Sequence, residues 1–338
     1  MLSAATMEVK TPSHPCRILS RIASTKEAVM AQHIPYDEFG MFHENAAEYG
    51  LPYDQPPVVR REEVALPDGR IMSSLIWGKG DPEIVLLHGG GQNAHTWDTV
   101  AMALSRPLIA IDQPGHGHSD AARRDVSMQQ GNAEAVADVI RVLAPNARGV
   151  VGMSMGGATT LALSLHAPEL VRSALLVDVT PGVTPEKGKQ IVDFLNGPVS
   201  FPDFDELLAR TIEFNSTRTV SSLRRGILHN AVPLADGSWV WRHQRHRLTG
   251  DAGVVLQGGA AAPGDEFFGD LWRAIDEMTV PLCLARGMRS QSVVSDEDEA
   301  EVLRRKPDAR VEHFEESGHS LQGDEPVKLA RLIDEFMP

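Results

Sequence analysis

The chain has 338 residues and a formal net charge of −14, with 46 acidic against 32 basic side chains. This acidic surplus is spread along the sequence, so we expect no nucleic acid partner. A hydrophobic content of 42% is that of an ordinary globular protein, long enough to bury a substantial core in one large or two modest domains.

Cysteine content and apolar runs bear on the compartment. Cys16 and Cys283 are too far apart to indicate a disulfide framework or a thiolate metal motif, which favours a reducing cytoplasm. The first thirty residues contain no apolar run of the kind that a secretory signal needs. The uncharged span Gly149–Ala167 is interrupted by glycine-dense turns, so we interpret it as a buried strand and a buried helix rather than a membrane span.

Residues 1–57 contain six prolines and little periodicity, which predicts an extension draped on or trailing from the core, with a helical patch near Glu38–Tyr49. This extension can cover the site, pair subunits in a homodimer or lack order, and we leave that choice open. The regular domain begins with Val59–Leu66 and Arg70–Trp77, which predict a β-hairpin around the turn Pro67–Gly69.

Short apolar runs then alternate with amphipathic segments. Such continuous apolar strands separated by helices predict a parallel sheet covered on both faces. The predicted strands are Ile84–Leu87, Leu108–Ile111, Val150–Met153, Ser173–Val179, Val280–Ala285 and Ala309–Phe314. The predicted helices are Ala94–Leu104, Met128–Leu143, Met155–His166, Asp296–Arg305 and Pro326–Phe336.

The rhythm breaks after Thr180-Pro181-Gly182, and residues 183–270 are helical and loop-like with few strand signals. We therefore predict an inserted, mainly helical cap at 183–270 over a core formed by residues 58–182 and 271–338. Four aromatic residues of this region either line a pocket or form the cap's own small core. They are Trp239, Trp241, Phe267 and Phe268.

The segment Gly152–Gly157 ends an apolar run and leads into a helix-like stretch, with Ser154 at its centre. A serine lifted out of a sharp strand-to-helix turn has a strained backbone, and Gly152 and Gly156 let the chain pass closely on both sides. The following helix directs free N–H groups at the serine, which suits an oxyanion. We expect Ser154 to be a nucleophile.

A second glycine-rich turn, His88-Gly89-Gly90-Gly91, follows a predicted strand. Glycines there let backbone N–H groups approach a substrate oxygen closely. The N–H groups of Gly90 and Met155 are the predicted oxyanion hole, with Gly91 as second choice. His95 and Trp97, just beyond the glycines, are candidates for the mouth of a pocket.

His319 lies in the segment Ser317–Ser320, after the last predicted strand. A neutral imidazole near pH 7 can take the serine proton and return it to a leaving group. We predict that His319 is this base, because it follows Ser154 in the required chain order. The other histidines outside the glycine turn, His229 among them, are assigned to surface or structural roles.

Together these motifs resemble those of the α/β-hydrolase family, over roughly residues 59–182 and 276–338. The resemblance implies a mostly parallel sheet with helices on both faces. A serine nucleophile argues against haloalkane dehalogenases and epoxide hydrolases, which have aspartate at the matching place. The residues that carry the resemblance are His88–Gly91, Asp112–Ser119, Gly152–Gly157 and Gly318-His319, of which Asp112–Ser119 matches a structural loop.

The acid of the triad is less clear, because Gln291 stands where the family usually has aspartate. A glutamine cannot supply the negative charge that stabilises an imidazolium. Asp178, at the end of the preceding predicted strand, is the preferred substitute, since a strand end holds a carboxylate rigidly. Asp296, and after it Asp298, is the alternative, from an acidic helix start.

The resemblance implies a serine hydrolase that cleaves a small apolar ester, lactone or related acyl compound through an acyl-enzyme. No metal or cofactor is needed, since the nucleophile and the proton shuttle suffice. Two alternatives stay open. One is a carbon–carbon bond hydrolase or a cofactor-free lyase or oxygenase on the same fold, and the other is a ligand-binding member that lost turnover.

Overall fold

The computed structural model describes residue 34 and residues 36–184, 186–244 and 266–337. Within these residues, eight strands form a sheet in the order β1-β2-β4-β3-β5-β6-β10-β11. β2 lies antiparallel to both β1 and β4, and all other neighbours are parallel, as predicted. The strands are β1 (Val59–Ala65), β2 (Ile71–Trp77), β3 (Ile84–Leu87), β4 (Leu108–Ile111), β5 (Gly149–Met153), β6 (Ala174–Val177), β10 (Leu282–Gly287) and β11 (Arg310–Phe314).

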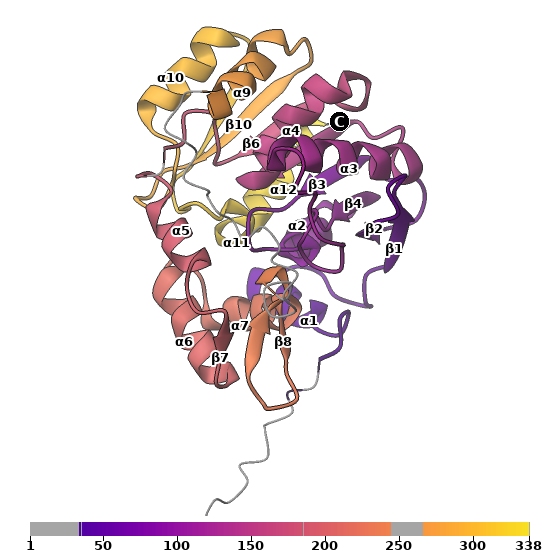
Figure 1. The fold of residues 1–338 in the computed structure, drawn as a ribbon, viewed down its shortest axis with the longest axis vertical. Helices are drawn as coiled ribbons and strands as arrows, with labels where there is room; N and C mark the ends of the chain where they lie inside the picture. Colours follow the sequence, from indigo (N-terminus) through magenta and orange to yellow (C-terminus); the bar gives the residue numbers. More distant parts are fainter. Residues whose placement is uncertain (1–33, 35, 185, 245–265, 338) are drawn as a thin grey trace, which may run out of the picture. The chain divides into compact units, whose positions relative to one another are not determined.

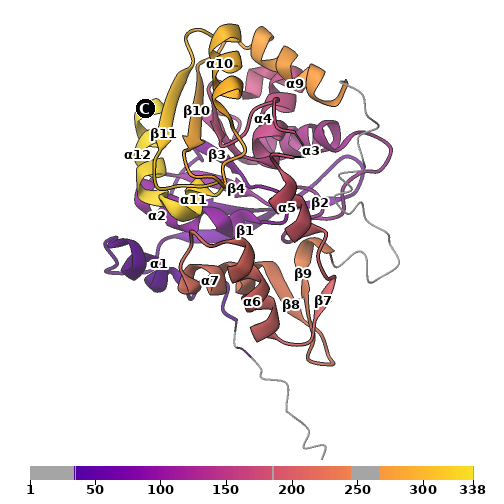
Figure 2. The same cartoon turned by 90° about the vertical axis from the view of Figure 1, so that its left-hand side faces the viewer.

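Helices cover both faces of this sheet (Figures 1 and 2). Neighbouring residues of a strand face opposite sides of the sheet. On β5, Val150 packs in the hydrophobic cluster that includes residues of α3, α4 and α9, whereas Val151 packs in the hydrophobic cluster that includes residues of α2 and α12. The helices are α2 (Asp98–Leu104), α3 (Met128–Leu143), α4 (Met155–His166), α9 (Glu266–Glu277), α10 (Asp296–Arg305), α11 (Leu321–Asp324) and α12 (Pro326–Phe336), with 3-10 turns η1 (Ala94–Trp97), η2 (Pro168–Leu170) and η3 (Arg242–Gln244).

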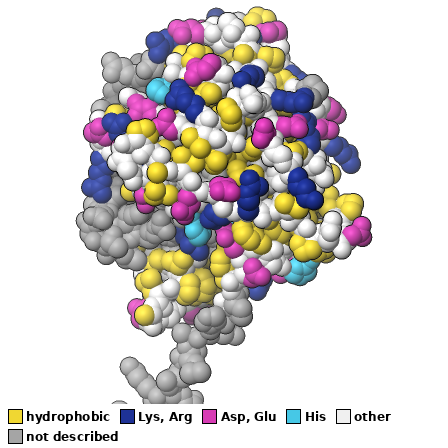
Figure 3. Space-filling view, turned by 90° about the vertical axis from the view of Figure 1, so that its right-hand side faces the viewer, with side chains coloured by type: hydrophobic (Ala, Val, Ile, Leu, Met, Phe, Trp, Pro, Cys, Tyr) yellow, Lys and Arg dark blue, Asp and Glu magenta, His cyan; other side chains and the backbone are white. Residues whose placement is uncertain are grey.

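The span Gly149–Ala167 folds as β5 and α4, as predicted. Among the described helices, not one is both long and apolar enough to cross a membrane. Acidic and basic side chains stand side by side on the face drawn in Figure 3, which matches the even spread of charges along the sequence.

The part of the predicted extension that follows residue 35 is packed on the core. Helix α1 (Phe42–Tyr49) buries Phe42, whose ring centroid lies 5.1 Å from that of Trp77 on β2. Just before α1, the Glu38 carboxylate accepts hydrogen bonds from Arg61 on β1 and lies 3.1 Å from His95 Nε2. This segment is therefore tied to the sheet and to η1.

The insertion between β6 and α9 contains α5 (Lys189–Leu195), α6 (Phe204–Phe214) and α7 (Val220–Asn230), together with three short strands (Figure 2). The strands β7 (Ser200–Phe201), β8 (Ala231–Pro233) and β9 (Trp239–Trp241) form an antiparallel sheet in the order β7-β9-β8. The sequence analysis did not predict this sheet, because strands of two or three residues are too short to show an alternation of apolar and polar residues. The available signal was the turn at Asp236-Gly237, where Gly237 has φ +87°.

Candidate active site

Ser154 stands at the turn between β5 and α4. Its φ is +51°, a value that non-glycine residues rarely adopt and that costs backbone strain. A Cβ atom at Gly156 would overlap the Leu87 carbonyl, and one at Gly152 would overlap the backbone of Gly156. The two glycines therefore let β5, β3 and α4 pack tightly enough to present the serine at the sheet edge.

Asp178 follows β6 directly, and its buried carboxylate accepts four hydrogen bonds. Oδ1 accepts from the Gly287 N–H at 2.9 Å and the Ser292 hydroxyl at 2.6 Å. Oδ2 accepts from the Val293 N–H at 3.0 Å and lies 2.8 Å from His319 Nδ1. Three fixed donors suit an ionised carboxylate, which then holds the histidine with its proton on Nδ1 and leaves Nε2 as an acceptor.

His319 and Ser154 line one pocket. The His319 Nε2 atom is buried and has no hydrogen-bond partner among the described residues, Ser154 included. Catalytic hydrogen bonds are often open in a ligand-free enzyme and close only around substrate. The arrangement thus places an imidazole nitrogen that has no partner among the described residues in the same pocket as a strained serine.

Of the three glycines after His88, two have their N–H groups engaged. Gly89 donates to Gln92 Oε1 at 3.1 Å, and Gly91 donates to His116 Nε2 at 3.1 Å. Within the described ranges no acceptor bonds the N–H of Gly90, which lines the pocket. Met155 is the first residue of α4, where a helix has N–H groups without intrahelical partners. Gly90 and Met155 are therefore the available pair, and Gly91 is not.

The two other candidates for the acid, Asp296 and Asp298, lie elsewhere, and Gln291 makes no bond to His319. Asp296 is 2.6 Å from Arg286 Nη2, and its side chain is 87% exposed. Asp298 closes the capping box of α10 and pairs with Lys187 at 2.5 Å. Gln291 lines the pocket beside the His319 loop, and its Oε1 is buried without a partner in the described structure. Only Asp178 among these contacts His319.

The predicted structural loop is held as expected. Buried Asp112 accepts from the Ala94 N–H at 2.7 Å and from Arg61 Nη1 at 2.8 Å. The Ser119 hydroxyl donates to the Asp112 carbonyl at 2.5 Å, which closes the turn. Asp112 and Ser119 therefore make their contacts outside the pocket.

Residues 84–332 match the model of the alpha/beta hydrolase family. The chain belongs to this family. It is 42% identical over 306 residues to a Mycobacterium tuberculosis protein named esterase Rv0045c, a match that covers 88% of this chain and 94% of that protein. The crystal structure of that esterase superposes with a TM-score of 0.72 at 40% identity, covering 89% of this chain and 98% of the other.

A second relative lies further away. A crystal structure of E-2-(acetamidomethylene)succinate hydrolase superposes with a TM-score of 0.67 at 22% identity, over 82% of this chain and 99% of that one, and shares the fold. The family match and the relative of 42% identity that is named an esterase show that this α/β-hydrolase is an enzyme of the hydrolase class.

The insertion supplies one wall of the hydrolase pocket. Phe194 and Leu195 of α5 line it, as does Trp241 of β9. Trp239 instead packs on Phe204 of α6, with ring centroids 5.1 Å apart, in the insertion's own core. The two tryptophans thus divide the two roles predicted for them. The side chains of Phe267 and Phe268 lie outside the described part of the chain, as does Cys16.

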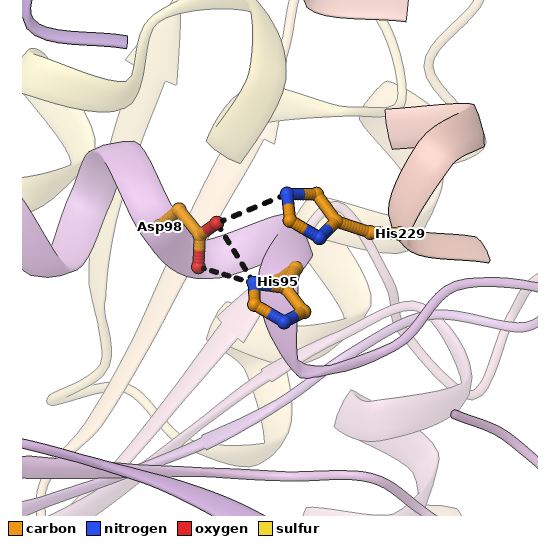
Figure 4. Close-up of side chains that lie close together, drawn as sticks. All are labelled: His95, Asp98 and His229. Carbon is orange, nitrogen blue, oxygen red and sulfur yellow. Dashed lines mark hydrogen bonds and ion pairs between the residues drawn. The ribbon is translucent and has the colours of Figure 1, made fainter. Parts of the chain in front are cut away.

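A buried polar cluster forms another wall, and Figure 4 shows its three members, His95, Asp98 and His229. His95 Nδ1 lies 2.9 Å from Asp98 Oδ2, and His229 Nε2 lies 3.7 Å from the same oxygen. The other nitrogen of the His95 ring, Nε2, lies 3.1 Å from Glu38, and the other nitrogen of the His229 ring, Nδ1, lies 3.0 Å from the Tyr36 hydroxyl.

The prediction that Trp97 lines the mouth of the pocket is wrong, because Trp97 is fully buried in the core.

The same three residues form a group of metal-ligating side chains whose ligand atoms lie within 4.8 Å of one another. The two imidazole rings are stacked, 3.8 Å apart and 10° from parallel. A metal ion lies in the plane of each imidazole that binds it. Two parallel stacked imidazole rings therefore cannot bind the same metal ion unless one of the rings turns. Burial lowers the pKa of His95, but Asp98 and Glu38 outweigh it and raise that pKa to about 9. The cluster therefore holds a proton between His95 and its two carboxylates.

Proposed function

We propose that this hydrolase is a serine esterase that cleaves a small carboxylic ester or lactone through an acyl-enzyme. The contact of 2.8 Å between Asp178 and His319 carries the proposal, because it supplies the charge that Gln291 lacks. The relative of 42% identity that is named an esterase supports an ester as substrate class.

The chemistry begins with the Ser154 hydroxyl, whose oxygen attacks the carbonyl carbon while His319 Nε2 takes its proton. The N–H groups of Gly90 and Met155 stabilise the negative charge on the former carbonyl oxygen. His319 then gives the proton to the departing alkoxide, which leaves as the alcohol. Water attacks the acyl-enzyme by the same route and releases the acid and free Ser154.

Asp178 acts as a positioning residue for the base in this scheme. Its charge stabilises the imidazolium, and its bond to Nδ1 sets the tautomer in which Nε2 accepts a proton. A lactone is a cyclic ester and opens by the same steps, with the alcohol remaining attached to the released acid.

We also propose the domain limits that suit this chemistry. The core comprises residues 58–182 and 271–338, and 183–270 forms the cap above the sheet edge. The helix α9 spans this last boundary, and its residues Leu271, Ala274 and Ile275 pack in the core cluster. The packing of these three residues supports a core that resumes at residue 271, within α9.

Labelling with a fluorophosphonate tests the assignment. The wild type should label stoichiometrically and release p-nitrophenol from a p-nitrophenyl ester with an acyl-enzyme burst, whereas Ser154→Ala should do neither. Ser164→Ala, in the same helix but bonded to the Leu161 carbonyl, is the matched control and should label normally. Unchanged labelling or turnover in Ser154→Ala would sink the proposal.

A further inference from the structure

A charged side chain in the pocket wall has no ion-pair partner among the described residues. Arg218 lies between α6 and α7 and lines the pocket that contains Ser154 and His319. Its Nη2 donates to the Ser222 hydroxyl at 2.5 Å, and its buried Nε has no acceptor among the described residues. In that part of the chain no carboxylate oxygen lies within 4.0 Å of the Arg218 guanidinium.

A neighbouring arginine in the same wall has its charge paired, although its Nε, like that of Arg218, has no acceptor among the described residues. Arg225, two helical turns further along, donates to the Glu48 carboxylate and lies 3.6 Å from Glu44. Its charge is therefore neutralised by α1. Arg218 is offered no such pair, since the nearby Asp324 carboxylate is bonded to the Gly318 N–H and the Thr217 hydroxyl.

A guanidinium removed from water without an anion is costly, because burial favours the neutral form. Burial accordingly lowers the pKa of Arg218, although Asp324 and Glu48 act on it through space. A folded protein retains such a group where a ligand supplies the missing charge, and the planar fork of arginine suits a carboxylate in particular.

The place of Arg218 relates it to the proposed catalytic base. A Cβ atom built on Gly323 would lie 2.8 Å from the Arg218 Cζ, so the guanidinium rests against α11. That helix begins at Leu321, two residues after His319. On the other side of the wall, the Tyr49 hydroxyl donates to the Gly323 carbonyl at 2.8 Å. Tyr49, Thr217 and Ser222 line the same pocket.

We propose that Arg218 binds a carboxylate carried by the substrate, so that the preferred substrates are esters with a second, ionised carboxyl group away from the scissile bond. The inference rests on the proposed esterase function and replaces the apolar substrate expected from the sequence. A single unpaired arginine matches one negative charge, which favours a carboxylate over a doubly charged phosphate.

The test compares two series of p-nitrophenyl esters, monoesters of straight-chain dicarboxylic acids from succinate to suberate and neutral esters of monocarboxylic acids of the same length. For wild type, kcat/KM should be higher for the charged member at one chain length or more. Arg218→Met should lower that kcat/KM roughly 10- to 100-fold, mainly through KM, and leave the neutral series within about twofold. Arg218→Lys should restore part of the loss.

Arg224→Gln is the matched control, because this exposed arginine on α7 is 3.9 Å from Glu44 and does not line the pocket. It should change neither series. Equal loss on both series in Arg218→Met and Arg218→Lys, with intact Ser154 labelling, would assign Arg218 a structural role and overturn the inference. So would a wild type that does not favour the charged esters.

A binding measurement separates this inference from the esterase proposal. Calorimetry with free glutarate and adipate should show binding to Ser154→Ala that Arg218→Met abolishes, whether or not either protein turns over an ester. Tighter binding of inorganic phosphate than of both dicarboxylates, or dicarboxylate binding that Arg218→Met retains, contradicts a carboxylate site. If wild type binds dicarboxylates but neither labels nor hydrolyses any ester, the esterase proposal fails and the carboxylate site stands.

Discussion

Asp178 Oδ2 and His319 Nδ1 lie 2.8 Å apart although 141 positions separate the two residues in the chain. The sheet explains the meeting, because β6, β10 and β11 are consecutive parallel neighbours. Asp178 follows β6, its donor Gly287 ends β10, and His319 follows β11. Residues after the carboxyl ends of adjacent parallel strands gather at one edge.

Replacing Asp178 with asparagine should lower kcat for ester hydrolysis by about 10³- to 10⁴-fold, since the imidazolium loses its counter-charge and His319 its tautomer. Asp296→Asn is the control and should retain wild-type kcat, because the Asp296 carboxylate is exposed and paired with Arg286. Steady-state kinetics on one p-nitrophenyl ester measures kcat for both variants, and circular dichroism checks that both variants are folded. An active Asp178→Asn enzyme would refute the role.

Two glycine substitutions should move stability in opposite directions. In Gly156→Ala the new methyl meets the Leu87 backbone carbonyl, and we expect a loss of about 1–3 kcal/mol in the free energy of unfolding. Gly226 lies inside α7 with nothing within 4 Å of an added Cβ, so Gly226→Ala should gain about 0.5–1 kcal/mol. Urea unfolding curves of both variants check this, and equal effects would contradict the packing of the turn.

The charge on His95 should make stability depend on pH. Its pKa in the folded protein is about 9, above the ordinary 6.5, so its stabilisation is complete below pH 6.5 and is lost as the pH rises through 9. We expect a loss of up to about 3 kcal/mol for wild type over that range and a much smaller loss for His95→Gln. Urea unfolding at about pH 6 and about pH 10 measures it.

Exposed His43 on α1 provides the control for this pH dependence, and His43→Gln should follow the wild-type curve. The Glu38 partner does not titrate in the same window. Burial opposes its ionisation, but the bonds from His95 and Arg61 lower its pKa to about 2. A pH dependence that persists in His95→Gln would place the responsible group elsewhere.

The Cys283 thiol should be inert in the folded enzyme. It is buried in β10, and burial raises its pKa to about 12, so almost no thiolate is present at neutral pH. Iodoacetamide should modify Cys283 in urea but not in buffer, as read by mass spectrometry of its peptide. Modification of the native protein at the rate seen in urea would show that β10 opens.

The alternating part of the chain could be predicted well, because period and length coincide there. The helices Met128–Leu143, Met155–His166, Asp296–Arg305 and Pro326–Phe336 have the predicted bounds. Each is an amphipathic or apolar run between clear turn signals, so the local pattern agrees with the tertiary structure.

The pocket walls could not be predicted in the same way. His95 and His229 are stacked, yet they come from η1 and α7, and no local pattern links two elements so far apart. The missing acceptor of Arg218 is likewise a property of three-dimensional packing, since the sequence shows only one basic residue among many. Asp178 could be predicted as the preferred acid because it stands at a strand end, where a carboxylate is held rigidly.

The positive φ of Ser154 has a counterpart at Asp178, where φ is +46°. The residues that precede them, Met153 and Val177, are partners in the parallel pairing of β5 and β6. Each strained residue costs of order 1–3 kcal/mol, which the rest of the fold must absorb. Heat resistance and turnover therefore compete at Ser154. A library selected only for thermostability should accumulate glycine at position 154, and its survivors would be stable proteins without activity. Asp178 should be kept, because its loss would leave the buried N–H groups of Gly287 and Val293 without an acceptor.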